Sequence, residues 1–436
     1  MTLPALNPAP VTTAALAIER SAPQRHLTGP ILAHALLRIA SGTSGVLIGL
    51  YLASLNSHGN HLSAGLVGTL SAVSFAAELF ASIPMGLASD ALQPRWLMTA
   101  GALIGSVAVF LFGISSSPRI FFLSRTLEGI GAAAIVPALL AYITTVTEGR
   151  PALRVRAMSY FELTLLAGLA LGGVAAAQLF RFLHGGAFAA VAVIYLACAT
   201  LLFRSVSGRI NSRAVSPIAD MKEVLRLPAL RHLAPVWLCV NSVVGLWLGP
   251  TLPFLLTQRS TSGQYLAGIY ASDPSRVGWM LLGYAIVFGL GVTGWSFVLP
   301  RIQLHTAMTI TLGAMLPVCG GLYLLNHSAN QPMNIRWAIG IVTSLLIMIE
   351  SGFTPAALAW LAGTLPAETG RGAAMGIYSF LLSVGAIIGS VLAGVLGERY
   401  LVDGLLCGTV LMAVAGLFFL HWVTDAQSSM NEVAHE

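Results

Sequence analysis

Long apolar runs dominate this chain and limit its fold more than any other feature does. A helix that crosses the hydrocarbon of a bilayer needs roughly 20 mostly apolar residues, and the 436 residues contain twelve such runs between short polar breaks. Only 9% of the residues are charged, against about 25% in a typical soluble domain. Because backbone groups find no water in hydrocarbon, the runs must form helices. We therefore predict an all-α, polytopic membrane protein.

The predicted spans form two sets of six, divided by the longest polar break at residues 204–232. The spans are 30–55, 64–88, 97–114, 119–146, 158–180, 186–203, 233–257, 277–299, 304–325, 335–362, 373–396 and 402–423. The predicted domains are a disordered tail at 1–28, an N-terminal half at 29–203, a linker at 204–232, a C-terminal half at 233–424 and a tail at 425–436. Within the linker, residues 218–226 have the pattern of a short amphipathic helix.

The two halves repeat each other at an offset of 217 residues. This shift aligns Arg154 with Arg371, Ala157-Met158 with Ala374-Met375, Gly168 with Gly385, and Gly172 with Gly389. Repeats of six spans keep the same orientation in the membrane, and repeats of this kind build many secondary transporters. The glycine pairs alone indicate only close helix packing. Their recurrence in register predicts two structurally equivalent halves.

The basic residues predict how the chain is oriented. With the N-terminus in the cytoplasm, fourteen Lys and Arg side chains fall on the cytoplasmic side and six on the opposite side. The positive-inside rule then places both termini in the cytoplasm, and we expect a multi-pass protein of a bacterial-type inner membrane. The rule also accounts for the net charge of +6, so no nucleic-acid partner is predicted.

Two motifs resemble those of the major facilitator superfamily. The loop after span 2 contains Gly86, Asp90 and Arg95 in the pattern G-x-x-x-D, although Ala91 replaces a basic residue of the family signature. Span 4 contains Arg125 and Gly129 in the family's R-x-x-x-G pattern. The resemblance implies the twelve-helix fold of that family and a conformational latch at Gly86, Asp90 and Arg95. The signature of drug:proton antiporters survives in span 5 only as its glycines, without the proline.

Five charged residues lie deep in predicted spans, where an isolated charge costs about 3 kcal/mol or more. The family resemblance implies that spans 1, 4, 7 and 10 line a central cavity, and four of the five lie on these spans. The five residues are Arg38 in span 1, Glu78 in span 2, Arg125 and Glu128 in span 4, and Glu350 in span 10.

Arg125 and Glu128 are three residues apart and share a helix face. Glu128 is either a proton site whose charge responds to Arg125 or one member of a constitutive ion pair. Arg38 and Glu78 reach similar depths, so they either pair across spans or leave Arg38 for an anionic substrate. Glu350 has no charged neighbour within four residues, and we favour it as the proton or cation site.

Aromatic and proline residues in the same spans suggest a cavity wall and helix breaks. Tyr142, Trp247 and Trp360 are candidates for an aromatic surface facing an apolar or cationic ligand, with interfacial anchoring as the alternative. Prolines in spans 4, 7 and 10 can open those helices, or act only as structural kinks. These prolines are Pro137, Pro250, Pro253 and Pro355.

The combined features predict a transporter and exclude most other classes. The sequence has no ATP-binding loop, metal-ligand spacing or nucleophilic constellation, so we expect no cofactor, no metal and no enzymatic activity. We predict a monomeric secondary active transporter that exports a small drug-like or metabolite solute in exchange for protons by alternating access. The alternative is an uptake carrier or facilitator for a sugar or organic anion.

Overall fold

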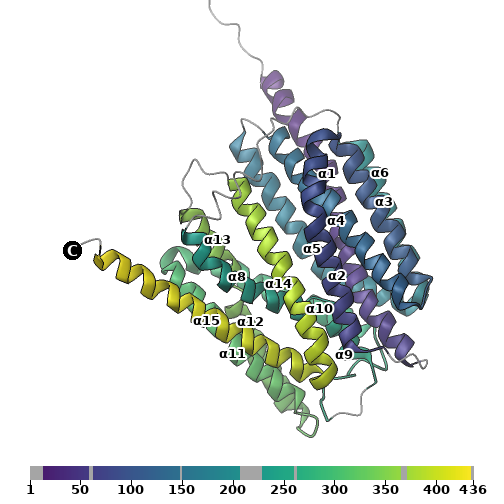
Figure 1. Cartoon of the computed structure of the whole chain (residues 1–436), viewed down its shortest axis with the longest axis vertical. Coiled ribbons are helices and arrows are strands. Elements are labelled where there is room, and N and C mark those ends of the chain that lie inside the picture. Colours follow the sequence, from purple (N-terminus) through teal and green to yellow (C-terminus); the bar gives the residue numbers. More distant parts are fainter. Residues whose placement is uncertain are drawn as a thin grey trace, which may run out of the picture.

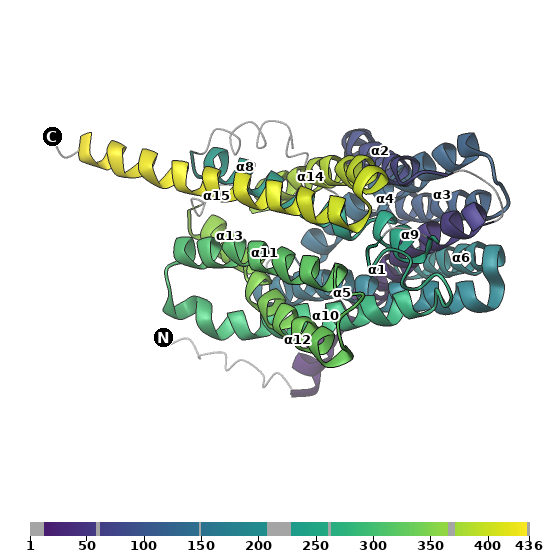
Figure 2. The same cartoon turned by 90° about the horizontal axis from the view of Figure 1, so that it is seen from below.

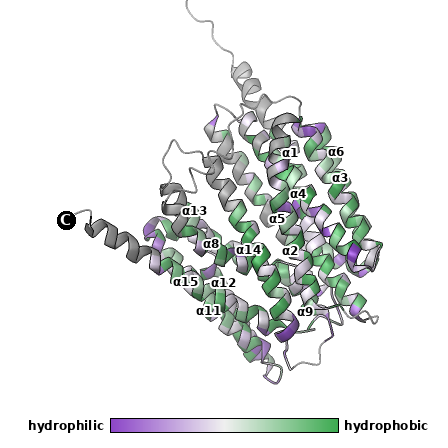
Figure 3. Cartoon of the chain, in the orientation of Figure 1, coloured by the Kyte–Doolittle hydropathy of each residue, from purple (hydrophilic) through white to green (hydrophobic). Residues whose placement is uncertain are grey.

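A computed structural model describes residues 13–57, 62–147, 150–206, 228–259, 263–364 and 371–433. These described residues form helices joined by turns, without a strand (Figure 1). In the coloured parts of Figure 3, apolar residues cover most of the helices, and many of the polar residues lie at helix ends and in loops. Large apolar side chains such as Phe80, Trp337 and Phe418 are exposed, as expected of surfaces that face lipid. The predicted all-helical membrane fold is confirmed.

Helices α1–α6, which we call the N-terminal half, pack mainly on one another. Its elements are α1 (Thr13–Ser57), α2 (Ala64–Ala91), α3 (Pro94–Gly113), α4 (Pro118–Val146), α5 (Pro151–Leu183), the short 3-10 helix η1 (His184–Gly186) and α6 (Ala187–Ser205).

Helices α8–α15 form the C-terminal half. Its elements are α8 (Pro228–Trp247), α9 (Thr251–Thr257), α10 (Arg276–Val298), the 3-10 helix η2 (Leu299–Arg301), α11 (Leu304–Asn326), α12 (Met333–Glu350), α13 (Phe353–Thr364), α14 (Arg371–Tyr400) and α15 (Val402–Val433).

The described residues contain eleven segments that are long and apolar enough to cross a membrane. One segment, residues 170–205, combines the end of α5, η1 and all of α6. The chain turns there at His184, whose backbone is left-handed with φ 48°. Two separate helices therefore occupy the region of predicted spans 5 and 6.

Spans 7 and 10 each consist of two helices. Span 7 changes from α8 to α9 just before Pro250, which lacks the N–H that would continue the helix. Span 10 breaks after Glu350, and Pro355 lies in the first turn of α13. The prolines of these two spans thus lie at helix breaks, as predicted. Pro137 lies inside an uninterrupted α4, which agrees with the alternative, a purely structural role.

The first and last helices of the chain are longer than predicted. α1 begins at Thr13, so residues 13–28 are helical, and the predicted disordered tail is wrong over that range. α15 continues to Val433, within the second predicted tail. Extending an existing helix adds one hydrogen bond per residue without a new nucleus, and residues 14–17 are strong helix formers, Ala-Ala-Leu-Ala. The amphipathic segment predicted at 218–226 lies outside the described residues.

The repeated glycines make equivalent contacts in the two halves. In the N-terminal half, a Cβ at Gly168 would lie 2.6 Å from the Arg38 carbonyl oxygen, and one at Gly172 would lie 2.8 Å from Gly42. In the C-terminal half, a Cβ at Gly385 would lie 2.5 Å from Asn241 Cβ. Helix α5 thus packs on α1 as α14 packs on α8. The offset found in the sequence therefore corresponds to a structural repeat.

The halves meet along two seams. Figure 2 shows α14 beside α2 and α10 beside α5, in agreement with the packing of these helices. We call the end of the molecule near Leu27 the inner end, because the charge distribution predicts it to be cytoplasmic, and the opposite end the outer end. The close contacts described between the halves lie in the outer parts of the helices, such as Gly68 with Gly394, Gly278 with Gly173, and Gly49 with Pro253. Toward its C-terminus, α15 runs obliquely away from α1–α6 (Figure 1).

Candidate functional site

Arg125 and Glu128 form an ion pair inside the N-terminal half. Their side chains are both 8% exposed, and Arg125 Nη1 contacts Glu128 Oε2 across one turn of α4. Arg125 Nε also donates to the Leu70 carbonyl oxygen of α2 at 3.4 Å. The predicted shared helix face is confirmed.

Two hydroxyl groups from neighbouring helices complete the surroundings of Glu128. Ser44 Oγ of α1 donates to Oε2 at 3.4 Å, and Tyr195 Oη of α6 donates to Oε1 at 3.4 Å. A buried charge is stable only when paired and hydrogen-bonded. The contacts from α1, α2 and α6 meet this requirement for the pair.

Arg38 belongs to a chain of hydrogen bonds that the sequence did not predict. Arg38 Nε donates to His34 Nε2 at 3.2 Å, His34 Nδ1 lies 2.6 Å from Thr164 Oγ1, and the Thr164 hydroxyl donates to the Phe161 carbonyl at 2.6 Å. Since the Thr164 hydrogen points to Phe161, His34 Nδ1 carries the proton and Nε2 accepts. His34 is therefore neutral, is 1% exposed and stacks on the Phe161 ring with centroids 4.1 Å apart.

Glu78 lies near the other three buried charges of the N-terminal half. It is half-buried on α2 and lies within electrostatic range of Arg38, Glu128 and Arg125. The four side chains carry two positive and two negative formal charges, so the cluster is neutral overall. Direct pairing of Arg38 with Glu78 stays a prediction.

Glu350 has different surroundings in the C-terminal half. It is half-buried and is the last residue of α12, immediately before the break at Ser351 and Gly352. It lies within electrostatic range of Tyr284 on α10 and Cys319 on α11. Among the described residues, Glu350 takes part in no ion pair.

The helix break beside Glu350 is held by Trp295 of α10. Trp295 Nε1 donates to the Ile349 carbonyl oxygen at 2.9 Å, and the indole lies so close to Gly352 that a Cβ there would collide with it. Carbonyl groups at the end of a half-helix carry partial negative charge. The break thus places the Glu350 carboxyl at a helix end that favours a proton or a cation.

The three candidate aromatic residues lie in packed surroundings. Tyr142 is fully buried in the core of the N-terminal half. Trp247 is half-buried and donates from Nε1 to Thr409 Oγ1 of α15 at 2.7 Å. Trp360 is half-buried against the core of the C-terminal half. Their role as a cavity wall stays a prediction.

The structure describes one side chain of the predicted latch. Arg95, at the start of α3, places its guanidinium 4.9 Å from the ring centroid of Phe203 on α6 and 5.4 Å from that of Trp96. Gly86 and Asp90 lie in the last turns of α2, but the surroundings of both residues are outside the described part of the structure. The latch remains an expectation from the family resemblance.

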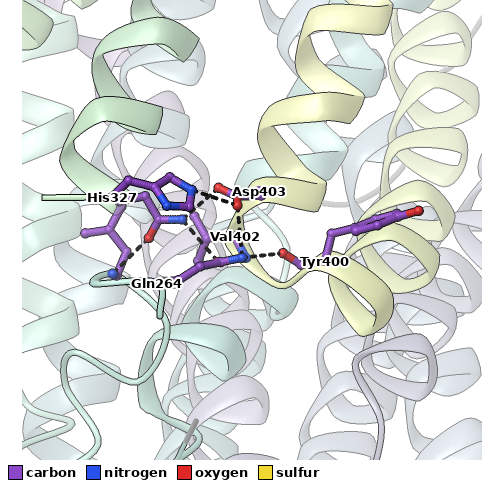
Figure 4. A network of polar contacts seen from close by, with 7 residues as sticks. Gln264, His327, Tyr400, Val402 and Asp403 are labelled. Carbon is purple, nitrogen blue, oxygen red and sulfur yellow. Dashed lines mark hydrogen bonds and ion pairs between the residues drawn. The ribbon is translucent and has the colours of Figure 1, made fainter. Parts of the chain in front are cut away.

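A polar network joins three segments at the outer end of the C-terminal half (Figure 4). Asp403, in the first turn of α15, accepts from Asn326 Nδ2 at 2.8 Å and from Gln264 Nε2 at 3.1 Å. His327 Nε2 lies 3.0 Å from the same carboxyl group. The side chain of Gln264 also bonds the backbone at Tyr400 and Val402. The network thus fixes the loop before α10 against α11 and α15.

The loop between α9 and α10 contains a second, smaller polar cluster. Asp273 accepts from Ser275 Oγ at 2.5 Å and from Arg276 Nε at 3.1 Å. The pKa of the Asp273 carboxyl is lowered, and the hydrogen bond from Ser275 is the main cause. In the described part of the chain, no three His, Cys, Asp or Glu side chains gather as they would around a metal ion.

Two repeated helical halves, with buried charges in their spans, have the architecture of a secondary membrane transporter. The chain belongs to the Major Facilitator Superfamily, because the model of that family matches residues 31–348. The resemblance read from the motifs at Asp90 and Arg125 is confirmed. The chain is therefore a multi-pass membrane transport protein rather than an enzyme.

Two relatives from Bacillus subtilis (strain 168) share part of the sequence. Multidrug resistance protein 2 is 31% identical over 144 residues, which cover 33% of this chain and 36% of the relative. Multidrug resistance protein 1 is 33% identical over 112 residues, which cover 26% of this chain and 28% of the relative. The matches thus span between about a quarter and about a third of each protein.

Solved structures share the fold over nearly the whole chain. The nucleoside transporter NupG superposes with a TM-score of 0.70 at 12% identity, covering 92% of this chain and 98% of that protein. A bacterial homologue of the human lysosomal transporter Spinster, in an inward-facing and occupied conformation, superposes with a TM-score of 0.68 at 14% identity, covering 91% and 96%. At these identities the likeness establishes the fold alone.

Proposed function

We propose that this protein is a proton-coupled exporter of small drug-like or metabolite solutes that works by alternating access. The observation that carries the proposal is the position of Glu350 at the break between α12 and α13, without an ion-pair partner among the described residues. A carboxyl group at that depth is stable when it is protonated or hydrated. Its protonation state therefore changes with its access to water.

The surroundings of the other acids support the choice of Glu350. Glu128 is fixed by Arg125, Ser44 and Tyr195, so the loss of its charge would leave a buried arginine unpaired. Glu78 lies among three other charges. We therefore assign the N-terminal cluster mainly to structure and Glu350 to proton coupling. The two multidrug resistance relatives support export over uptake.

The moving bodies of the proposed cycle are the predicted halves, residues 29–203 and 233–424, joined by the linker at 204–232. The distribution of basic residues supports cytoplasmic termini in a bacterial-type inner membrane. In that orientation the described close contacts between the halves lie toward the periplasm, and we assign the conformation to a state closed on that side. We propose that a monomer completes the cycle.

Purified protein in liposomes tests the proposal directly. An imposed pH gradient should drive accumulation of at least one compound from a panel of lipophilic cations, sugars and organic acids. Glu350→Gln should abolish gradient-driven accumulation while leaving the folded yield and the exchange of labelled for unlabelled solute intact. Glu350→Asp is the matched control, since it keeps a titratable group and should retain coupling. Normal gradient-driven accumulation by Glu350→Gln would overturn the proposal.

An uptake carrier or facilitator for a sugar or an organic anion is the second candidate. The observation that favours it is the half-buried guanidinium of Arg38 on α1, which His34 and Thr164 hold in place. A positioned guanidinium recognises carboxylate or phosphate groups. Transport of an organic anion that ignores the pH gradient, and that Arg38→Lys weakens, would support this candidate.

A further inference from the structure

A carboxylate of the C-terminal half reaches the start of a helix in the N-terminal half. Glu398, in the last turn of α14, accepts a hydrogen bond from the Gly65 backbone N–H at 3.1 Å. Gly65 is the second residue of α2, and Ser63 caps the next turn by accepting from Leu66 N at 3.2 Å. The first N–H groups of a helix lack intrahelical partners and carry partial positive charge. Glu398 therefore supplies a favourable charge at the N-terminus of α2.

The contact lies at the outer end of a close seam between α2 and α14. Gly65 allows the carboxylate to approach, since a Cβ there would occupy the position of Glu398 Oε2. Further along the seam, Gly68 packs on Gly394, and Ser390 Oγ donates to Ser71 Oγ at 3.1 Å. Small residues thus bring the two helices together directly beneath the Glu398 contact.

The second seam has the same packing but the opposite charge. A Cβ at Gly278 of α10 would lie 2.7 Å from both Gly173 O and Ala177 Cβ of α5. The repeat offset of 217 aligns Gly173 with Ser390, Ala177 with Gly394, and Arg181 with Glu398.

An arginine therefore takes the place of the carboxylate in the second seam. A cation is unfavourable at a helix N-terminus. The start of α10 already has a local acid, because Asp273 bonds Ser275 and Arg276. The repeat therefore provides a carboxylate for this contact in the α2–α14 seam and an arginine at the equivalent position of the α5–α10 seam.

We propose that Glu398 is a gating residue of the transport cycle, which holds the outer end closed by binding the N-terminus of α2. This inference rests on the proposed alternating access, since the outer end must open for solute to leave. Glu398 is exposed, and exposed electrostatic contacts are weak. A weak contact suits a gate, because it biases two states of similar free energy without locking one of them.

Two variants break the contact in different ways. Glu398→Ala removes the carboxylate. Gly65→Ala displaces it by adding a methyl group against the end of a flexible side chain, and alanine also favours the helix. Arg181→Ala is the matched control, because it removes an exposed charge at the equivalent position of the repeat.

Spin labels on the outer loops measure the opening in the full-length protein. The labels are attached to the variants Ser116→Cys and Asn330→Cys, at the outer ends of the two halves, in a background that also contains Cys407→Ser, since Cys407 is exposed. Distance distributions from pulsed electron paramagnetic resonance should show the ratio of outer-open to outer-closed molecules rising about two- to fivefold in both Glu398→Ala and Gly65→Ala. Arg181→Ala should match the parent protein.

The outcomes separate this inference from the proposed function. Unchanged distances in Glu398→Ala and Gly65→Ala would overturn the gating role, as would an equal shift in Arg181→Ala. If Glu350→Gln retains proton coupling while the two variants still shift the distances, the assignment of the proton site fails and the gate stands. If the parent protein has no outer-open population under any gradient or solute, alternating access and the gate fail together.

Discussion

The two halves share a helical scaffold but bury different polar groups. In both, a glycine-rich helix lies against the first helix of its half, α5 on α1 and α14 on α8. The N-terminal half adds a neutral cluster of four charges, with Arg125 and Glu128 ion-paired inside it. The C-terminal half has Glu350 at a helix break, outside any ion pair of the described residues. Equivalent packing therefore supports two different electrostatic roles.

This difference has a physical consequence for transport. A buried charge with a partner stays charged through a conformational change, whereas an acid without one gains or loses a proton when its access to water changes. Under the proposed function, the N-terminal half acts as a fixed electrostatic body and the C-terminal half contains the group that responds. Three experiments test this contrast.

The largest effect should come from breaking the buried ion pair. Glu128→Gln leaves Arg125 buried without its counter-charge, so we expect a loss of about 3 to 5 kcal/mol in the free energy of unfolding. Thermal unfolding of detergent-purified protein, together with the monodisperse yield, measures this loss. The exposed pair provides the control, because Arg276→Gln removes a side chain that is 69% exposed and should cost less than about 1 kcal/mol.

A double variant and a transport assay extend this experiment. Arg125→Met combined with Glu128→Met should recover most of the stability lost by Glu128→Gln, since no unpaired charge remains. If Glu128→Gln were instead fully stable and defective in gradient-driven transport, Glu128 would be a proton site. The contrast between the two halves would then be wrong.

Intermediate effects should be equal in the two halves. Gly168→Ala and Gly385→Ala each add a methyl group into a close helix contact, and overpacking typically costs about 1 to 3 kcal/mol. Gly313→Ala is the control, because nothing lies within 4 Å of its added Cβ. Unfolding temperatures of the three variants measure the result. A loss at Gly168 without one at Gly385 would argue against equivalent scaffolds.

A last comparison concerns one buried hydrogen bond in each half, and the smallest effect is expected at Thr409. Thr164→Val leaves the fully buried His34 N–H without its acceptor, which should cost about 1 to 3 kcal/mol. Thr409→Val removes the acceptor of a half-buried Trp247, and we expect about 0.5 to 1.5 kcal/mol. The serine variants at both positions keep the hydroxyl group and should match the parent protein. Equal losses would show that the polar contacts of the two halves are equally protected from water.

Local patterns predicted a definite part of the site. The spacing of Arg125 and Glu128 was sufficient to place both on one helix face. His34 lies four residues before Arg38, so the same rule places it beside Arg38, although a histidine is not among the charged residues from which the site was predicted. Thr164, Ser44 and Tyr195 gave no such signal, because their contacts join helices far apart in the sequence. The outer network around Asp403 was likewise invisible in the sequence.

The apolar segments, the repeat and the family follow from the sequence alone, whereas the ends of the first and last helices do not. Hydropathy over roughly 20 residues decides whether a segment can span a bilayer, and the offset of 217 residues follows from side-chain identity alone. The contacts between buried polar groups appear only in the three-dimensional structure. It joined Arg38 to His34 and Thr164, placed Glu350 at a helix break and brought Glu398 to Gly65. Such contacts depend on the rotation and relative depth of neighbouring helices, which a one-dimensional pattern does not specify.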